Sequence, residues 1–373
     1  MATAKILITG GAGFIGSHLV DALIRQGNDV RILDSLDPQV HPGKKAPSYL
    51  NPKADFIAGD VTDYGVFANA LKDREVVFHY AASVGIGQSN YRISHFVKNN
   101  ILGTANLLDI LANGKHAVKH VVLPGSNTSY GEGLYRCARC GIYHPQLRTK
   151  EQVEAYGFEV ACPECKNSAQ PIPTPEETGL WCNSIYSFTK RGQEDMLHFV
   201  GKTYGIPTTV LRFFNVYGPR QSLSNPYTGV TAIFTGRIKE GKAPVIYEDG
   251  LQARDFVSVH DVVEASILAM KTTASHQETF NVGTGQPIPI RDVALSIAKL
   301  HNSPLRPEIT RTFRKGDIRH CFADTKKAEQ KLGFKAKVHF LQGMQELFEW
   351  SRRESSGGDF ERATKELEEK GLL

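Results

Sequence analysis

The sequence contains no apolar run that approaches the ~18 residues of a membrane-spanning helix. Its first residues, MATAKILITGG, lack the apolar region and small-residue cleavage site of a secretory signal. Basic residues form no block, and 44 Lys and Arg against 39 Asp and Glu leave a net charge of only +5. We therefore expect a soluble, cytoplasmic protein that binds neither membranes nor nucleic acid.

Cysteine is scarce, with six in 373 residues, and reduced cytoplasmic thiols argue against a disulfide framework. Four of the six form two CxxC pairs, Cys137 with Cys140 and Cys162 with Cys165. Two such pairs supply the thiolates of a tetrahedral structural zinc site, which leaves no open position for catalysis. The spacing predicts this zinc site, with unmetallated buried thiols and a redox pair as alternatives. Cys182 and Cys321 have no partner by spacing and are expected to be free thiols.

Strand-like and helix-like stretches alternate along the first part of the chain. A strand at 5–10, a glycine turn entering a helix at 10–27 and a strand at 29–34 predict a parallel sheet with crossover helices. Further strands are predicted at 54–60, 75–82, 118–126 and 208–216, and a helix at 100–114. The predicted fold class is α/β, a Rossmann-type doubly wound sheet with a zinc-ribbon-like insertion and a smaller C-terminal substrate lobe.

The length of the chain predicts more than one compact unit. We expect a first domain at 1–210, interrupted by the four-cysteine insertion at 134–175, and a second lobe at 211–350 that can return to the first domain. Helices are predicted in that lobe at 254–270 and 289–301. Residues 351–373 are charged with little apolar face, which predicts a solvated tail helix.

A glycine motif, TGGAGFIG at 9–16, opens the first predicted helix. Gly10, Gly13 and Gly16 let a backbone approach a pyrophosphate at the helix N-terminus, where free N–H groups favour anions. Asp34 ends the next strand, where its carboxylate can accept hydrogen bonds from a ribose 2′-hydroxyl and repel a 2′-phosphate. The first domain is therefore predicted to bind NAD and not NADP. The alternative is a glycine turn with a purely structural role.

A tyrosine and a lysine lie four residues apart in NSIYSFTK, so on a helix Tyr186 and Lys190 share one face. Tyrosine, with an ordinary pKa near ~10, is a poor base at neutral pH. A neighbouring ammonium and a positively charged nicotinamide favour the phenolate and bring that pKa down. The pair is thus a candidate for proton transfer, and an ordinary helix-surface pair is the alternative.

The order of these motifs resembles the extended short-chain dehydrogenase/reductases that act on nucleotide sugars. The motifs are TGGAGFIG, Asp34, GDV at 59–61, HYAA at 79–82, NNILGT at 99–104, GSNTSYG at 125–131, YSFTK at 186–190 and RFFNVYGP at 212–219. The resemblance implies that the following residues bind the cofactor: Gly10, Gly13, Phe14, Ile15, Gly16, Asp34, Asp60, Val61, Tyr80, Ala81, Ala82, Asn99, Tyr186, Lys190 and Phe214.

The same resemblance implies a catalytic set and a substrate set. Tyr186 matches the base, Lys190 the residue that binds nicotinamide ribose and lowers the tyrosine pKa, and Ser126 the serine that hydrogen-bonds the reacting sugar oxygen. The implied substrate ligands are Ser126, Thr128, Asn215, Arg254 and Arg314. The two arginines are assigned to the diphosphate, because guanidinium pairs bidentately with phosphate oxygens, while surface salt bridges are the alternative.

The absence of acidic residues from the segment 126–129 narrows the set of possible reactions. Dehydratases and decarboxylases of the family usually carry acids there, and this segment has none. Asp34 argues against the NADP that reductases often prefer, which leaves epimerisation at C4. The stretches 85–96, 131–137 and 219–229 resemble dTDP-L-rhamnose 4-epimerases, which also form dTDP-6-deoxy-L-talose. Alternatives are a UDP-glucose/UDP-galactose or other deoxysugar epimerase, a 4-ketosugar reductase, and a nucleic-acid-binding zinc-ribbon cofactor sensor. Family analogy implies a homodimer through helices near 91–112 and 186–203.

Overall fold

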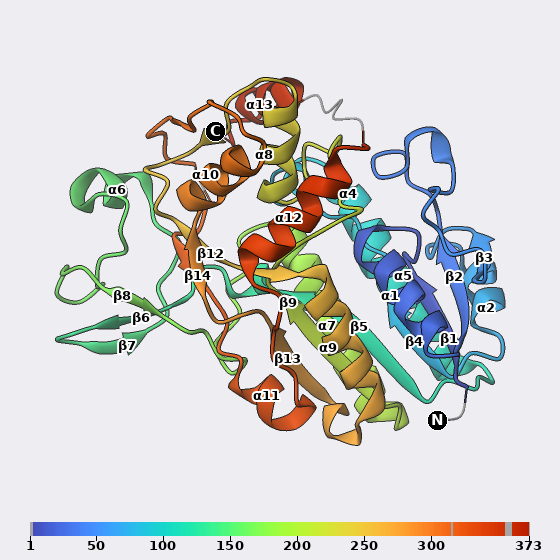
Figure 1. The fold of residues 1–373 in the computed structure, drawn as a ribbon. Coiled ribbons are helices and arrows are strands. Elements are labelled where there is room, and N and C mark those ends of the chain that lie inside the picture. The colour runs from blue at the N-terminus through green and yellow to red at the C-terminus, as the bar shows by residue number, and fades with distance from the viewer. Residues whose placement is uncertain (1–2, 315, 355–359, 373) are drawn as a thin grey trace.

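A seven-stranded parallel sheet forms the centre of the molecule (Figure 1). The computed structural model describes residues 3–314, 316–354 and 360–372. The strand order is β13-β9-β5-β4-β1-β2-β3, so the chain winds outward from β1 in one direction and then from β4 in the other. The strands are β1 Lys5–Thr9, β2 Asp29–Asp34, β3 Asp55–Ala58, β4 Val76–His79, β5 His120–Ser126, β9 Thr208–Phe213 and β13 Glu278–Val282. The predicted α/β doubly wound fold is confirmed, and its reversal between β1 and β4 opens a crevice at the carboxyl ends of the strands.

Helices cover both faces of this sheet, as parallel strands with apolar side chains on both faces require. One face packs against α1 Phe14–Arg25, α9 Val259–Lys271 and α11 Lys326–Leu332. The other packs against α2 Tyr64–Leu71, α5 Gly103–Asn113 and α7 Ile185–Tyr204. In α1 the buried residues Leu19, Val20 and Leu23 follow the three-to-four spacing of one helix face. These two apolar layers hold the strand ends that form the site.

A smaller lobe lies over the carboxyl edge of the sheet. Its strands are β10 Asn215–Tyr217, β12 Ala253–Ser258, β14 Pro287–Pro289 and β16 His320–Cys321, with β11 Val245–Ile246 paired to β15 Glu308–Ile309. Its helices are α8 Val230–Lys239, α10 Ile290–Leu300, α12 Phe340–Ser351 and α13 Phe360–Glu369. The chain returns to the large sheet in β13, α9 and α11, and the predicted boundary near residue 210 remains a prediction.

One predicted helix has to be corrected. Residues 254–270 were expected to be helical throughout, but Ala253–Ser258 form β12 and the helix α9 begins at Val259. The strand pairs with β10, β14 and β16, so backbone partners distant in sequence decide its conformation. As a result, Arg254 lies on a strand of the smaller lobe and not on a helix.

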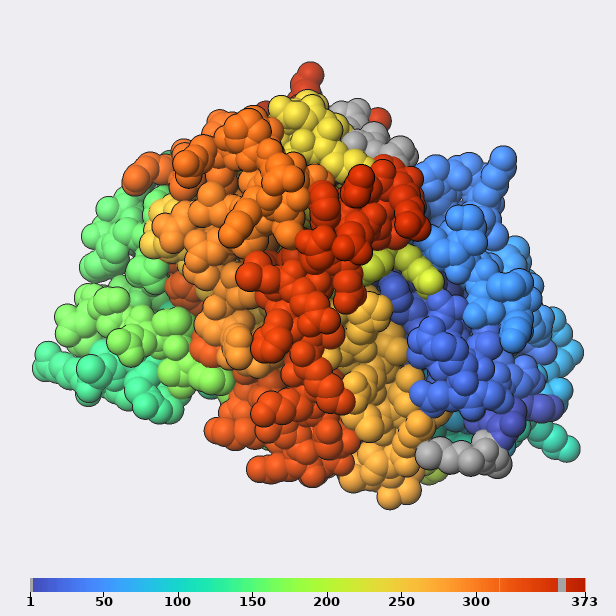
Figure 2. Space-filling view, in the orientation of Figure 1, coloured from blue at the N-terminus to red at the C-terminus, as the bar shows by residue number. Residues whose placement is uncertain are grey.

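The four-cysteine insertion forms a small unit of its own, which we call the cysteine module (residues 134–175). It contains a three-stranded antiparallel sheet, β7-β6-β8, and one short helix. These elements are β6 Leu134–Cys137, β7 Gly141–Tyr143, β8 Gln170–Ile172 and α6 Lys150–Tyr156. In the space-filling view the module projects from the side of the molecule, in green (Figure 2).

Short helical segments connect the main elements. They are η1 Pro42–Lys44, α3 Ile86–Ser89, α4 Ile93–Phe96, η2 Val97–Leu102, η3 Asn127–Tyr130 and η4 Thr273–Ser275. The predicted helix at 100–114 therefore begins as the π-helical η2 and continues as α5. Within the described ranges, no helix is both long and apolar enough to cross a membrane.

Candidate active site

A single cavity of about 1210 Å³ runs from the carboxyl ends of the central strands into the smaller lobe. Every residue that the sequence assigned to cofactor, catalysis or substrate lines it. The glycine loop lies in its wall together with Asp34, and Arg254 and Arg314 line the part formed by the smaller lobe. Because parallel strands end at one edge, residues far apart in sequence are brought to one crevice.

The glycine loop fits a dinucleotide pyrophosphate. Gly10 has φ +70°, and a Cβ there would lie 2.8 Å from the backbone nitrogen of Ala81. A Cβ on Gly16 would collide with the carbonyl oxygen of Gly10. Gly13 is the N-cap of α1, with no side-chain cap and no acid in the first turn. The helix N-terminus therefore presents its positive end to the cavity, where an anion is favoured.

Asp34 lies at the end of β2 and is held by backbone donors. Its carboxylate accepts hydrogen bonds from the N–H of Ala12 at 3.0 Å and the N–H of Leu36 at 2.9 Å. The residue is 8% exposed and lines the cavity. A carboxylate has about four acceptor positions, so two bound N–H groups leave capacity for a ribose hydroxyl.

The candidate proton-transfer residues come from two elements. Ser126 ends β5 and caps η3, and its Oγ lies 2.9 Å from Oγ1 of Thr128. Tyr186 lies in the first turn of α7, which begins with a capping box formed by Ser184 and Ser187. Lys190 lies one turn further on, where its Nζ donates to Oε1 of Gln193 at 3.0 Å.

Burial controls the ionisation of both residues. It raises the pKa of Tyr186 to about 12, and the hydrogen bond with Ser126 opposes that rise. Burial also lowers the pKa of Lys190 to about 7, against the opposing effect of Glu194. Desolvation is the largest influence on the pKa of Tyr186, and the group that lowers this pKa is Ser126, so the lowering by Lys190 stays a prediction.

The two candidate diphosphate ligands share one carboxylate. Arg254 and Arg314 each lie 3.2 Å from a carboxylate oxygen of Asp317, and Arg314 also lies 5.3 Å from the ring centre of Tyr247. Burial would raise the pKa of Asp317, but Arg314, Arg254 and Arg148 outweigh it and lower that pKa. Two guanidinium groups against one carboxylate leave excess positive charge for an anion.

Asn215 adds a second polar feature to this end of the cavity. Its buried Oδ1 has no hydrogen-bond partner among the described residues. An unpaired buried polar atom costs free energy unless a ligand or water satisfies it. The assignment of Asn215 to substrate stays a prediction, and a ligand or water at this oxygen would satisfy it.

The C-terminal helix α13 was missed as part of the site. It was expected to be solvated, but one of its faces lines the cavity, through Phe360, Glu361, Ala363, Thr364, Lys365, Leu367 and Glu368. The carboxylate of Glu366 also accepts hydrogen bonds from Tyr91 at 2.9 Å and Tyr227 at 2.7 Å. The signal in the sequence was the spacing of Phe360, Ala363 and Leu367 on one helix face. Residues 355–359 and 373 of the predicted tail lie outside the described residues.

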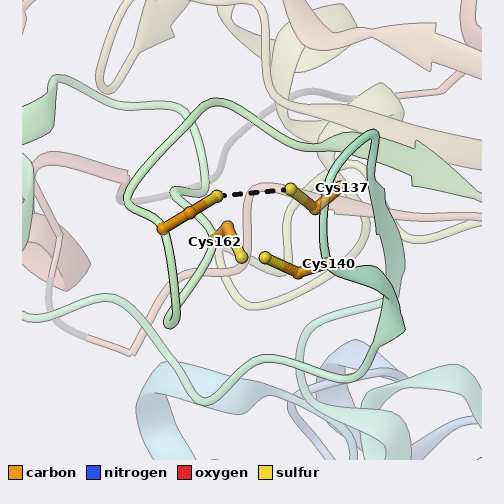
Figure 3. A group of neighbouring side chains, drawn as sticks. Cys137, Cys140 and Cys162 are labelled. Atoms are coloured by element: carbon orange, nitrogen blue, oxygen red, sulfur yellow. Dashed lines mark hydrogen bonds between the residues drawn. The ribbon is translucent and has the colours of Figure 1, made fainter.

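The four module cysteines lie outside the cavity, with their sulfur atoms all within 4.8 Å of one another. The Sγ atoms of Cys137 and Cys165 are 3.5 Å apart, and the side chains labelled in Figure 3 point toward a common centre. Backbone N–H groups of Cys140 and Arg139 lower the pKa of the Cys137 thiol, which favours the thiolate. The other two cysteines, Cys182 and Cys321, are free thiols.

Comparison with known proteins identifies the family. Residues 6–283 match the model of the NAD dependent epimerase/dehydratase family. The chain belongs to this family, and the predicted resemblance is confirmed. It is an enzyme of the NAD-dependent epimerase type, and the prediction of NAD as its cofactor is supported by solved relatives that contain NAD.

Several relatives span almost the whole chain. The dTDP-L-rhamnose 4-epimerase of Burkholderia thailandensis is 35% identical over 94% of this chain and 95% of its own length. A putative UDP-glucose 4-epimerase of Methanocaldococcus jannaschii is 32% identical, covering 93% of this chain and 98% of that protein.

Solved structures show the same likeness. The UDP-glucose 4-epimerase of Thermotoga maritima with UDP-glucose has a TM-score of 0.75 and 32% identity, covering 94% of this chain and 99% of that one. The Thermus thermophilus UDP-glucose 4-epimerase in complex with NAD has a TM-score of 0.74 and 27% identity, with the same coverage. These relatives differ in nucleotide and sugar, so they define the family of this chain and not its substrate.

Proposed function

We propose that this enzyme is a nucleotide-sugar 4-epimerase that interconverts dTDP-L-rhamnose and dTDP-6-deoxy-L-talose. The observation that carries the proposal is one cavity lined by the glycine loop, by Ser126, Tyr186 and Lys190, and by the paired arginines. The choice of sugar nucleotide is supported by the Burkholderia relative. A UDP-glucose/UDP-galactose or other deoxysugar epimerase is the alternative that the other relatives favour.

In the proposed mechanism, Tyr186 acts as the base once ionised. Its phenolate takes the proton of the sugar 4-hydroxyl while Ser126 donates a hydrogen bond to the oxygen that becomes a carbonyl. The glycine loop and Asp34 would hold NAD, which would supply reversible hydride transfer at C4 of the sugar. Lys190 would bind the nicotinamide ribose and, when protonated, favour the phenolate. Arg254, Arg314 and Asn215 would hold the diphosphate while the 4-keto sugar turns about it.

The environment of Glu132, the first acidic residue after the segment 126–129, supports epimerisation over dehydration. Glu132 follows the segment 126–129, but it is 1% exposed and does not line the cavity. Its carboxylate accepts hydrogen bonds from Tyr135 and from the backbone N–H of Arg319 and His320. It is therefore committed to structure and is not available to move protons at C5 or C6 of a sugar.

One assay tests reaction and substrate together. The NAD-loaded enzyme is incubated with a panel of dTDP-, UDP- and GDP-sugars, and epimers are identified by NMR. We expect dTDP-L-rhamnose to give its C4 epimer with no net change in NADH. Tyr186→Phe should reduce turnover by roughly 10³-fold or more, because the base is lost, while nucleotide-sugar binding persists. Stoichiometric NADH consumption would favour a 4-ketosugar reductase, and near wild-type turnover of the variant would overturn the mechanism.

We also propose that the module binds a structural zinc ion through its four cysteines. Tetrahedral coordination with Zn–S distances of ~2.3 Å places sulfur atoms about 3.8 Å apart. The four sulfur atoms all lie within 4.8 Å of one another, and those of Cys137 and Cys165 are 3.5 Å apart, so the observed separations are close to that distance. The module has a small apolar core, formed by Tyr135, Val160 and Ala169, so a metal would supply much of its stability. Its four thiolates would leave no position for a substrate.

A homodimer is proposed from an exposed apolar surface on neighbouring helices. Its side chains belong to α4, η2 and α7, which pack together. They include Ile93, Val97, Leu102, Phe188 and Phe199, the last of which is 71% exposed. An exposed apolar surface of this kind is suited to bind a second copy of the chain. Light scattering that returns the mass of one chain would contradict this proposal.

A further inference from the structure

The cysteine module is joined to the smaller lobe by a buried ionic network. From the module come Arg148 and Glu159, and from the lobe come Glu248, Asp249 and Arg319. The side chains of Arg148, Glu248 and Arg319 are 4%, 1% and 0% exposed. Long charged side chains are rarely buried unless they are paired, so this contact is a specific one.

The geometry of the network is that of a guanidinium fork on a carboxylate. Arg148 donates to both oxygens of Glu248, at 3.1 and 2.9 Å. Arg319 donates to Glu248 at 3.0 Å and to both oxygens of Asp249, at 2.7 and 2.9 Å, and it also pairs with Glu159. Removing one member of such a set leaves a buried charge without its full partners, which is strongly unfavourable.

Glu248 is held in an unusual backbone conformation, with φ +56°. A left-handed φ is unfavourable for a non-glycine residue and persists only where its surroundings enforce it. Here the buried side chain is held by Arg148 and Arg319. The backbone of Glu248 in turn orders the facing segment, because its N–H donates to Thr312 and its carbonyl accepts from Arg311. That segment leads to Arg314.

The network also reaches Arg254. The guanidinium of Arg148 donates to the carbonyl of Asp317 at 3.3 Å, and the carboxylate of Asp317 pairs with Arg254 and Arg314. Arg254 donates in addition to the carbonyl oxygens of Arg319 at 2.9 Å and Ile318 at 2.7 Å. Arg148 does not line the cavity, but it holds the groups that orient Arg254 and Arg314, which do.

We infer that the cysteine module is a positioning part of the substrate site, in which Arg148, through Glu248 and Asp317, holds Arg254 and Arg314 in the orientation that binds a nucleotide-sugar diphosphate. This role rests on the proposed function, since it needs a diphosphate at the paired arginines. The module then acts at a distance from the reacting sugar, on substrate affinity and not on proton or hydride transfer.

The test compares Arg148→Met with Arg136→Met in the NAD-loaded enzyme. Arg136 lies in the same module and is exposed, so its variant makes the same change of charge outside the network. Binding of dTDP and UDP is measured by calorimetry, and KM and kcat with the nucleotide sugar. We expect Arg148→Met to raise Kd and KM by about 10- to 100-fold with kcat changed by less than about threefold, because misplaced binding groups weaken affinity first. Arg136→Met should change neither by more than about twofold.

Two further variants separate positioning from folding. Arg148→Lys should give an intermediate Kd, because an ammonium keeps the charge but cannot form the fork. If Arg148→Met does not fold, Glu248→Gln keeps the shape of the partner and should shift Kd in the same direction. A lowered melting temperature with unchanged Kd for dTDP and UDP would overturn the inference.

The outcomes also distinguish this inference from the proposed function. Wild-type protein that binds neither dTDP nor UDP would overturn both. Wild-type protein that binds them but forms no epimer would overturn the epimerase proposal, while the effect of Arg148 on Kd would still support the positioning role.

Discussion

The cysteine module and the C-terminal helix α13 differ in how their sequences relate to their places in the structure. The module has the strongest chemical pattern in the chain, yet its cysteines lie outside the cavity. The helix α13 has a charged sequence without a reactive motif, yet it lines the cavity with seven residues. A local pattern of cysteines therefore predicts that their side chains cluster, whereas a place in the active site depends on what a segment packs against.

Packing explains why α13 belongs to the site. Phe360 lies against Gly236 of α8, and Leu367 lies against Gly87 of α3. Glu366 joins Tyr91, near the large sheet, to Tyr227, in the smaller lobe. The helix thus contacts both walls of the cavity, and Figure 1 shows it beside α8. The buried ion pairs of the module, in contrast, connect it to the smaller lobe.

The largest effect is expected from removing α13. A chain that ends at Glu354 should lose about tenfold or more in kcat/KM, because the cavity loses a wall that excludes water. It should also release the 4-keto sugar during turnover, which leaves reduced cofactor on the enzyme and raises absorbance at 340 nm. Leu367→Asp, which places a charge against Gly87, should act in the same direction. Unchanged kinetics in both variants would show that α13 is only a neighbour of the site.

A smaller effect is expected from substituting one of the four clustered cysteines of the cysteine module. Cys137→Ser should lose the zinc, measured by metal analysis, and lower the melting temperature by roughly 5 °C or more. It should also raise Kd for dTDP, because Arg148 loses its support, while NAD content stays unchanged. Cys182→Ser is the matched control, since this thiol lies outside the cluster. Native protein without zinc would contradict the metal proposal.

The smallest effect is expected from Glu366→Gln. The substitution removes the charge of the group that accepts two hydrogen bonds at a partly exposed site. We expect it to lower the free energy of unfolding by at most about 1 kcal/mol and to raise KM by a few-fold. The hydrogen bonds from Tyr227 and Tyr91 lower the pKa of Glu366 below its ordinary value of 4.5. The stabilisation is therefore present above that value and is lost as pH falls through the lowered pKa. Melting temperatures of both proteins should converge in acid, and a difference that persists there would need another cause.

Local patterns account for what could be predicted. The six strands expected along the first part of the chain are all present, because short apolar runs bounded by turns specify buried strands. The glycine loop and Asp34 were located together, since their spacing follows from one strand, one turn and one helix. The segment 254–270 was assigned wrongly, because its strand depends on partners elsewhere in the chain.

The sequence by itself determined the doubly wound sheet and the clustering of four cysteines, and it predicted the dinucleotide loop and the set of Ser126, Tyr186 and Lys190. Each depends on residues close in the chain or on motifs in a fixed order. Only the tertiary structure decided that α13 lines the cavity and that Arg148 is tied to Glu248, a hundred residues away. Burial and ion pairing are contacts between distant segments, so no local pattern records them.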